Sequence, residues 1–87
     1  MWQIIWHDHA LKKLKKFPRV VRERALRYME ERVLKANHPR DFGHGLVGDK
    51  TGFWRYRIGD YRLICRINET EKTIEIRDLG HRKDIYD

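Results

Sequence analysis

The chain has 87 residues, a length that suits one domain with a small core. Hydrophobic residues make up 40% of the sequence and charged residues 38%, which excludes a disordered chain and predicts a highly charged surface. The 20 Lys and Arg against 13 Asp and Glu give a formal net charge of +7. This excess favours a polyanionic or acidic partner, which means nucleic acid, an anionic membrane or an acidic protein.

The apolar start of the chain does not have the pattern of a targeting segment. It ends at His7 and Asp8, so it is too short for a signal peptide and lacks the basic start of one. No segment reaches the roughly 20 apolar residues of a membrane span, and we expect a cytoplasmic protein without membrane contact. Cys65 is the single cysteine, which excludes an internal disulfide and a cysteine-based zinc site, and its apolar surroundings predict a core position.

The first part of the chain predicts one strand followed by two helices. Residues 2–6 are aromatic and β-branched, as in a strand, and Asp8 is a suitable N-cap for a short helix over residues 9–16. Pro18 interrupts this helix and suits position N1 of the next, which we expect to run to about Ala36. Its apolar residues have the spacing of one buried helix face; they are Val21, Ala25, Tyr28, Met29 and Val33.

The second part of the chain predicts a loop and three strands. Residues 40–52 are rich in glycine and are expected to be mostly loop. Strands are predicted over residues 53–58, 61–67 and 73–79, where apolar and charged residues alternate with period 2. The Gly-Asp dipeptide at positions 59–60 predicts a type II′ turn that joins the first two of these strands as a hairpin.

The predicted hairpin contains an electrostatic conflict. Its turn places Ile58 across from Tyr61, which is good packing, but it also places Arg57 directly opposite Arg62. Two cations at opposed positions destabilise a sheet unless an anion binds them, and such a conflict usually has a functional reason. We therefore interpret this face as a binding site for a polyanion.

The predicted fold class is α+β, with the element order β-α-α-β-β-β. Two N-terminal helices pack on one face of a mostly antiparallel, twisted four-stranded sheet. The other face of the sheet is expected to gather cations from three strands. These cations are Arg55, Arg57, Arg62, Arg66 and Arg77.

Three stretches of the chain resemble a known family. Residues 46–48 (Leu-Val-Gly), 54–64 with Gly-Asp-Tyr-Arg, and 79–86 with Gly-His-Arg and a terminal Tyr are similar to the RelE/ParE toxin superfamily of type II toxin–antitoxin systems. The tail is more similar to the RelE branch. The resemblance covers essentially the whole chain as a single domain, residues 1–87, with a RelE-like fold.

The resemblance implies an activity. RelE-like members are ribosome-dependent endoribonucleases, or mRNA interferases, which cut mRNA in the ribosomal A site without a metal or other cofactor. Members of the ParE branch inhibit DNA gyrase and generally lack the tail residues used for RNA cleavage. Gyrase inhibition is the first alternative activity for this chain. The second alternative is a non-catalytic basic module that binds nucleic acid, which would need stacking aromatic residues on the basic face.

The resemblance also implies roles for individual residues. Arg62 corresponds to the arginine that contacts the scissile phosphate, and Arg55 and Arg57 correspond to the two basic positions of the preceding strand. Arg82 matches the basic residue of the tail, and Tyr86 matches the aromatic residue that orients a codon base. A guanidinium suits phosphate because it is planar, always charged and able to donate two parallel hydrogen bonds.

Proton transfer is assigned to His81. Some relatives carry lysine where this chain has Arg55 and Arg57, and arginine is a poor general base because its pKa lies above about 12. Imidazole acts as an acid or a base near neutrality, so the pattern points to His81. The expected catalytic residues are Arg57, Arg62, His81, Arg82 and Tyr86.

Further cations are expected to contact RNA phosphates. They are Arg55, Arg66, Arg77, Lys12, Lys13 and Lys16. The histidines at positions 7, 9 and 44 fit no established metal-ligand spacing, and no metal is expected. The implied partners are an acidic, RelB-like antitoxin that folds on binding, the ribosome with its mRNA, and operator DNA bound only through the antitoxin complex.

Overall fold

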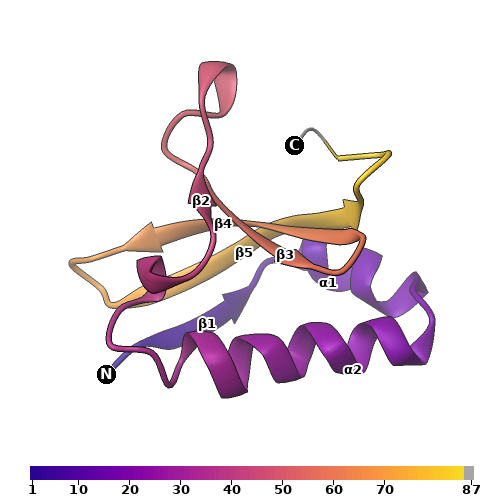
Figure 1. The fold of residues 1–87 in the computed structure, drawn as a ribbon, viewed down its shortest axis with the longest axis horizontal. Helices are drawn as coiled ribbons and strands as arrows, with labels where there is room; N and C mark the ends of the chain where they lie inside the picture. The colour runs from indigo at the N-terminus through magenta and orange to yellow at the C-terminus, as the bar shows by residue number, and fades with distance from the viewer. Residues whose placement is uncertain (86–87) are drawn as a thin grey trace.

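The computed structural model describes residues 1–85. A mixed five-stranded sheet in the order β1-β5-β4-β3-β2 carries two helices on one face (Figure 1). The elements are β1 (Gln3–Trp6), α1 (Asp8–Lys16), α2 (Arg19–Tyr28) with a π-helical turn (Met29–Val33), β2 (His44–Gly45), β3 (Trp54–Ile58), β4 (Tyr61–Asn68) and β5 (Thr73–His81), with 3-10 turns at Pro39–Asp41 and Gly48–Lys50. The predicted α+β class is confirmed, and the sheet has five strands instead of the predicted four.

Strand β5 lies between the first strand of the chain and the hairpin. Its first half pairs in parallel with β1, from Gln3 opposite Thr73 to Trp6 opposite Ile76. On its other side β5 pairs antiparallel with β4, and β4 pairs antiparallel with β3. Strand β5 is also two residues longer than predicted, so that it ends at His81.

The main core lies between the sheet and the helices. Its buried members are Ala10, Leu14, Ala25, Met29, Val33, Tyr56, Ile58, Leu63, Cys65, Ile74, Ile76 and Leu79. The helix residues among them lie on the faces that the apolar spacing predicted. The predicted core position of Cys65 is confirmed, since the residue is fully buried, and burial raises the pKa of its thiol.

A smaller apolar cluster lies on the opposite face of the sheet, which we call the outer face. Leu46, Ile64 and Ile85 are its buried members, and Phe53 packs against them. Ile64 points outward from β4, and the loop before β3 and the start of the tail cover it. The outer face is therefore partly enclosed.

Both helices begin differently from the prediction. His7 is the N-cap of α1 because its backbone is still extended (φ −69°, ψ 151°), and Asp8 lies in the first turn, where a carboxylate stabilises the helix dipole. Pro18 is the N-cap of α2 instead of its N1 residue, since its ψ of 147° is not helical. The helical segment ends with the π turn at Val33, short of Ala36, and β2 replaces part of the predicted loop.

The hairpin has the predicted register and turn. Ile58 opposes Tyr61 and Arg57 opposes Arg62. Gly59 has a φ of +60°, whereas Asp60 is not among the residues with positive φ, which defines a type II′ turn. The opposition of two arginines expected from the sequence is therefore present in the fold.

A β-bulge changes the alternation of β5. Ile64 opposes Asp78 while the next residue of β4, Cys65, opposes Ile76, so Arg77 is the extra residue. Beyond Arg77 the side chains of β5 exchange faces relative to an uninterrupted strand. As a result Leu79 faces the core and Asp78 faces outward.

Substitution of Met29 by Ala should lower the free energy of unfolding by about 2–5 kcal/mol, because the removed side chain is fully buried in the core. Urea denaturation followed by circular dichroism measures the change. Val20→Ala is the control on α2, since Val20 is 68% exposed, and its effect should stay within about 0.5 kcal/mol. Equal losses in the two variants would contradict the assigned core.

The Cys65 thiol should react with a thiol reagent only when the protein unfolds. Burial excludes the reagent, and the raised pKa keeps the thiol protonated, whereas the thiolate is the reactive form. Labelling with Ellman's reagent at mildly alkaline pH should be slow in native buffer and fast in concentrated urea. Fast labelling of the folded protein is the result that this burial does not allow.

Candidate functional site

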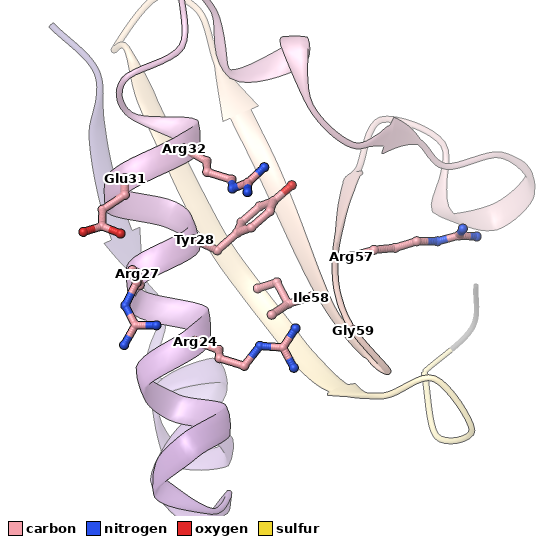
Figure 2. A pocket seen from close by; sticks show the side chains of 8 residues that line it. All are labelled: Arg24, Arg27, Tyr28, Glu31, Arg32, Arg57, Ile58 and Gly59. Atoms are coloured by element: carbon pink, nitrogen blue, oxygen red, sulfur yellow. The ribbon is translucent and has the colours of Figure 1, made fainter.

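Two arginines lie side by side on the outer face, at the closed end of the hairpin. Figure 2 shows Arg57 pointing away from α2, whereas its neighbour Ile58 points toward α2. Arg62 shares the face of Arg57 because residues directly opposite each other in an antiparallel pair have their side chains on one side. The fold therefore places two arginine side chains on the same side of the hairpin, where Arg57 is exposed and Arg62 is buried.

The guanidinium of Arg62 is held by the turn. Its Nη1 donates to the carbonyl oxygen of Gly59 at 2.8 Å and to that of Tyr61 at 3.0 Å. The residue is only 6% exposed. A cation that is already oriented interacts with a developing negative charge without the cost of reorganising. The side chain is therefore fixed in orientation and largely shielded from solvent, and its role at a phosphate stays a prediction.

Further arginines extend this site along the outer face. Arg55, which is 9% exposed, opposes Ile64, and Arg66 lies over the ring of Phe53 at 5.4 Å. We call the surface formed by Arg55, Arg57, Arg62 and Arg66 the arginine face. Arg77 lies beyond it on β5, with its Nη1 3.6 Å from a carboxylate oxygen of Glu75. Four of the five arginines predicted for this side of the sheet therefore form the arginine face, and the fifth, Arg77, borders it.

His81 does not share the face of Arg62. It is opposite Tyr61, and the two rings meet edge to face with centroids 5.5 Å apart. The ring of Tyr61 also lies 5.2 Å from that of Phe17, on the helix side of the sheet. The Nδ1 of His81 accepts a hydrogen bond from the backbone N–H of Lys83 at 3.2 Å. His81 therefore lies at the end of β5 but on the other side of the sheet.

The tail is attached to the hairpin turn through Arg82. Its backbone N–H donates to the carbonyl oxygen of Asp60 at 2.7 Å, and its Nε lies 3.7 Å from the Asp60 carboxylate. These contacts bring Arg82 to the end of the sheet where Arg62 lies. Tyr86, the remaining predicted catalytic residue, lies outside the described residues.

The lysines predicted to contact RNA occupy two different surroundings. Lys12 and Lys16 are exposed on α1. Lys13 is half-buried, and its Nζ lies 2.8 Å from the Asp78 carboxylate. The same Nζ is 3.6 Å from the place where a Cβ would lie on Gly80, the residue opposite Arg62. Lys13 therefore reaches the arginine face, while the other two lysines remain on the helix surface.

A basic groove between α2 and β3 was not recognised in the sequence. It encloses about 420 Å³, and Arg24, Arg27 and Arg32 line its helix side (Figure 2). The Arg24 guanidinium is so close to Gly59 that a Cβ there would lie 3.1 Å from it. These arginines recur at intervals of three to five residues along the helix, and this spacing is the sequence pattern that could have predicted a basic groove.

Burial shifts the pKa values of the two tyrosines near this groove upward. Burial raises the pKa of the Tyr56 hydroxyl, which donates to the carbonyl oxygen of Pro39 at 2.7 Å. Burial also raises the pKa of Tyr28, although Arg32 opposes the shift.

Within residues 1–85, His, Cys, Asp and Glu form no group of three or more that could hold a metal ion. No helix of this part of the chain has both the length and the apolar content to span a bilayer.

Comparison with known proteins identifies the family. Residues 4–86 match the family described as the ParE toxin of the type II toxin–antitoxin system, parDE, and the chain belongs to this family. No curated protein sequence matches the chain. The predicted membership of the RelE/ParE superfamily is confirmed, and the protein is a toxin of the type II toxin–antitoxin class.

Solved structures with the same fold come from RelBE complexes. A chain of the RelBE2 toxin–antitoxin complex of Mycobacterium tuberculosis superposes with a TM-score of 0.83 at 23% identity, covering 93% of this chain and 91% of that chain. For the RelE–RelB complex of Pyrococcus horikoshii the TM-score is 0.72 at 26% identity, with coverages of 97% and 98%. For that of Methanococcus jannaschii it is 0.70 at 26% identity, with coverages of 94% and 94%. The fold is therefore that of the RelE-like toxins.

Proposed function

We propose that this toxin is a ribosome-dependent endoribonuclease that cleaves mRNA in the ribosomal A site and thereby inhibits translation. The observation that carries the proposal is the direct opposition of Arg57 and Arg62 on the outer side of the hairpin. Guanidinium groups bind phosphate through paired hydrogen bonds, and two arginines at opposed positions suit one phosphate of an RNA strand. The likeness to RelE chains supports the same branch.

The proposed reaction is a transesterification at phosphorus. The 2′-oxygen of one nucleotide loses its proton and forms a bond to the neighbouring phosphorus, while the bond from phosphorus to the 5′-oxygen breaks and that oxygen gains a proton. Negative charge grows on the phosphorane oxygens in between. Arg62, with Arg57 and Arg82, stabilises that charge, since preorganised cations act most strongly where charge develops. Tyr86 is proposed to position a codon base.

His81 is proposed to transfer the proton, because imidazole can act as an acid or a base near neutrality. Its ring lies on the side of the sheet opposite to Arg62, but it is the last residue of β5, and Arg82 follows it directly. Because the proton-transfer group and the phosphate ligand must reach the same phosphodiester, the scissile phosphate is proposed to lie at the end of the sheet, between the two residues. This position places the reacting nucleotide at the edge of the arginine face.

The proposed partners follow from the charge and the family. The solved complexes pair RelE with RelB, and we propose that an acidic, RelB-like antitoxin covers the cationic surface of this chain. A net charge of +7 accelerates association with an acidic segment, which folds as it binds. The ribosome with its mRNA is the proposed target, and operator DNA is bound only through the antitoxin complex.

Gyrase inhibition is the second candidate. The family that the chain matches is described as a ParE toxin, and the resemblance assigns ParE members to DNA gyrase. This activity would not need the guanidinium pair at a scissile phosphate. A supercoiling assay therefore accompanies the cleavage assay below.

Arg62→Ala should lower mRNA cleavage by about 100-fold or more, because removal of one preorganised donor to a developing oxyanion has that effect in other enzymes. Primer extension on a defined mRNA in translating ribosomes measures the cuts. Lys35→Ala, which removes an exposed cation far along the chain from the site, is the matched control and should cut like the wild type. The wild-type cuts should fall at A-site codons and require ribosomes.

Two results would contradict this proposal. Cuts that persist unchanged in Arg62→Ala would remove the arginine from the mechanism. Wild-type protein that makes no cuts but blocks supercoiling by gyrase would move the chain to the gyrase-directed branch.

His81→Ala should slow cleavage by about 10²–10⁴-fold and abolish the pH dependence of the rate near neutrality, because general acid–base catalysis contributes that much. Single-turnover cleavage measured across a pH series provides both readouts. Arg62→Ala should be slow but keep the pH dependence, since its guanidinium does not titrate in this range. A His81→Ala profile that matches the wild-type profile would assign proton transfer to another group.

A further inference from the structure

A hollow of about 350 Å³ lies on the outer face, between β4, β5 and the loop that precedes β3. Phe53 and Ile64 supply apolar surface to it, while Lys50, Arg77, Asp78 and His9 are among its polar lining. The volume is in the range of small-molecule sites, and its mixture of an apolar floor with a few polar groups is typical of them. The sequence did not predict this site.

The hollow continues the arginine face. Ile64 is two residues from Arg62 on β4, so their side chains share one face and their backbones are about 7 Å apart. On the other side, Arg66 lies over the ring of Phe53 at 5.4 Å. A strand of RNA bound at Arg62 can therefore extend along β4 into the hollow.

The β-bulge brings two adjacent polar residues of β5 to the hollow. As the extra residue of β5, Arg77 joins Asp78 at the hollow, whereas in a regular strand adjacent residues would face opposite ways. The charge of the Asp78 carboxylate is offset by the Lys13 Nζ at 2.8 Å, and the Nε2 of His9 lies 3.3 Å from the same carboxylate. It also accepts the backbone N–H of Leu79 at 2.8 Å, which fixes its orientation.

We propose that this hollow is a nucleotide subsite that holds a residue of the RNA strand adjacent to the cleavage site. The base lies against Phe53 and Ile64, and the phosphate pairs with Lys50 and Arg77. Base–aromatic stacking and phosphate–cation contacts are the interactions by which proteins bind single-stranded RNA. The inference rests on the proposed function, because it takes RNA as the substrate, and it deepens that function by adding a second place where the strand is held.

A binding experiment tests the subsite without cleavage. The probe is a short single-stranded RNA with 2′-O-methyl groups throughout, which removes the attacking hydroxyl, and fluorescence anisotropy measures its affinity. Phe53→Leu removes the ring but retains an apolar side chain for the Leu46 and Ile64 cluster, and it should weaken binding by about tenfold. Urea denaturation should show that this variant is folded.

The salt dependence supplies a second readout. Lys50→Ala should reduce the slope of log affinity against log salt by about 0.7, the value for one phosphate contact to a single strand. Lys35→Ala makes the same change of charge outside the hollow and should leave the slope as in the wild type. In the wild type, the oligonucleotide should shift the backbone NMR signals of residues 50–53, 64 and 77–78.

The possible outcomes separate the subsite from the proposed function. Folded Phe53→Leu that binds RNA as tightly as the wild type, or a polyglutamate peptide that shifts the same NMR signals while the RNA does not, would overturn the subsite and make the hollow a protein-docking site. Phe53-dependent RNA binding by a protein that makes no cuts on ribosomes would retain the subsite and overturn the nuclease. Loss of binding in Phe53→Leu together with ribosomal cleavage by the wild type is the expected result.

Discussion

The turn at Gly59 and Asp60 is the constraint on which the site depends. A type II′ turn needs positive φ at its first central residue, and with only two residues between the strands it allows one register. That register buries Tyr56 against Leu63 on the helix side, and on the outer side it forces Arg57 to face Arg62. The packing of the core therefore keeps the two arginines at opposed positions. The turn carbonyls that accept from Arg62 orient its charge.

The two faces of the sheet are built by the same strands but serve different ends. The helix side is a continuous apolar core, whereas the outer side combines arginines with a small apolar cluster around Ile64. The tail adds one apolar contact and one ion pair on this outer side. Ile85 packs in the apolar cluster, and Arg82 pairs with Asp60. The outer face thus presents charged residues to solvent, while the loop before β3 and the tail cover its apolar cluster.

The features that were predicted correctly depend on local spacing, and the others depend on pairing. The hairpin and the buried helix faces follow from periods of 2 and 3.6, which any short window shows. Strand β2 has two residues and exists only because it pairs with Trp54 and Arg55. The face of His81 could not be read from uninterrupted alternation, because the bulge at Arg77 inverts it. The spacing of Ile74, Ile76 and Leu79 indicates the bulge, because Leu79 breaks the interval of two residues between apolar positions.

The position of β5 in the sheet has a consequence for how the protein is made. Strand β1 is synthesised well before its parallel partner, Thr73–Ile76. Pairing over such a sequence separation is slow, because a long loop must close before the contacts form. A nascent chain that ends before Thr73 has no partner for β1 and none for the edge of β4 that faces away from β3. The sheet that carries the arginine face is therefore completed only once β5 has been synthesised.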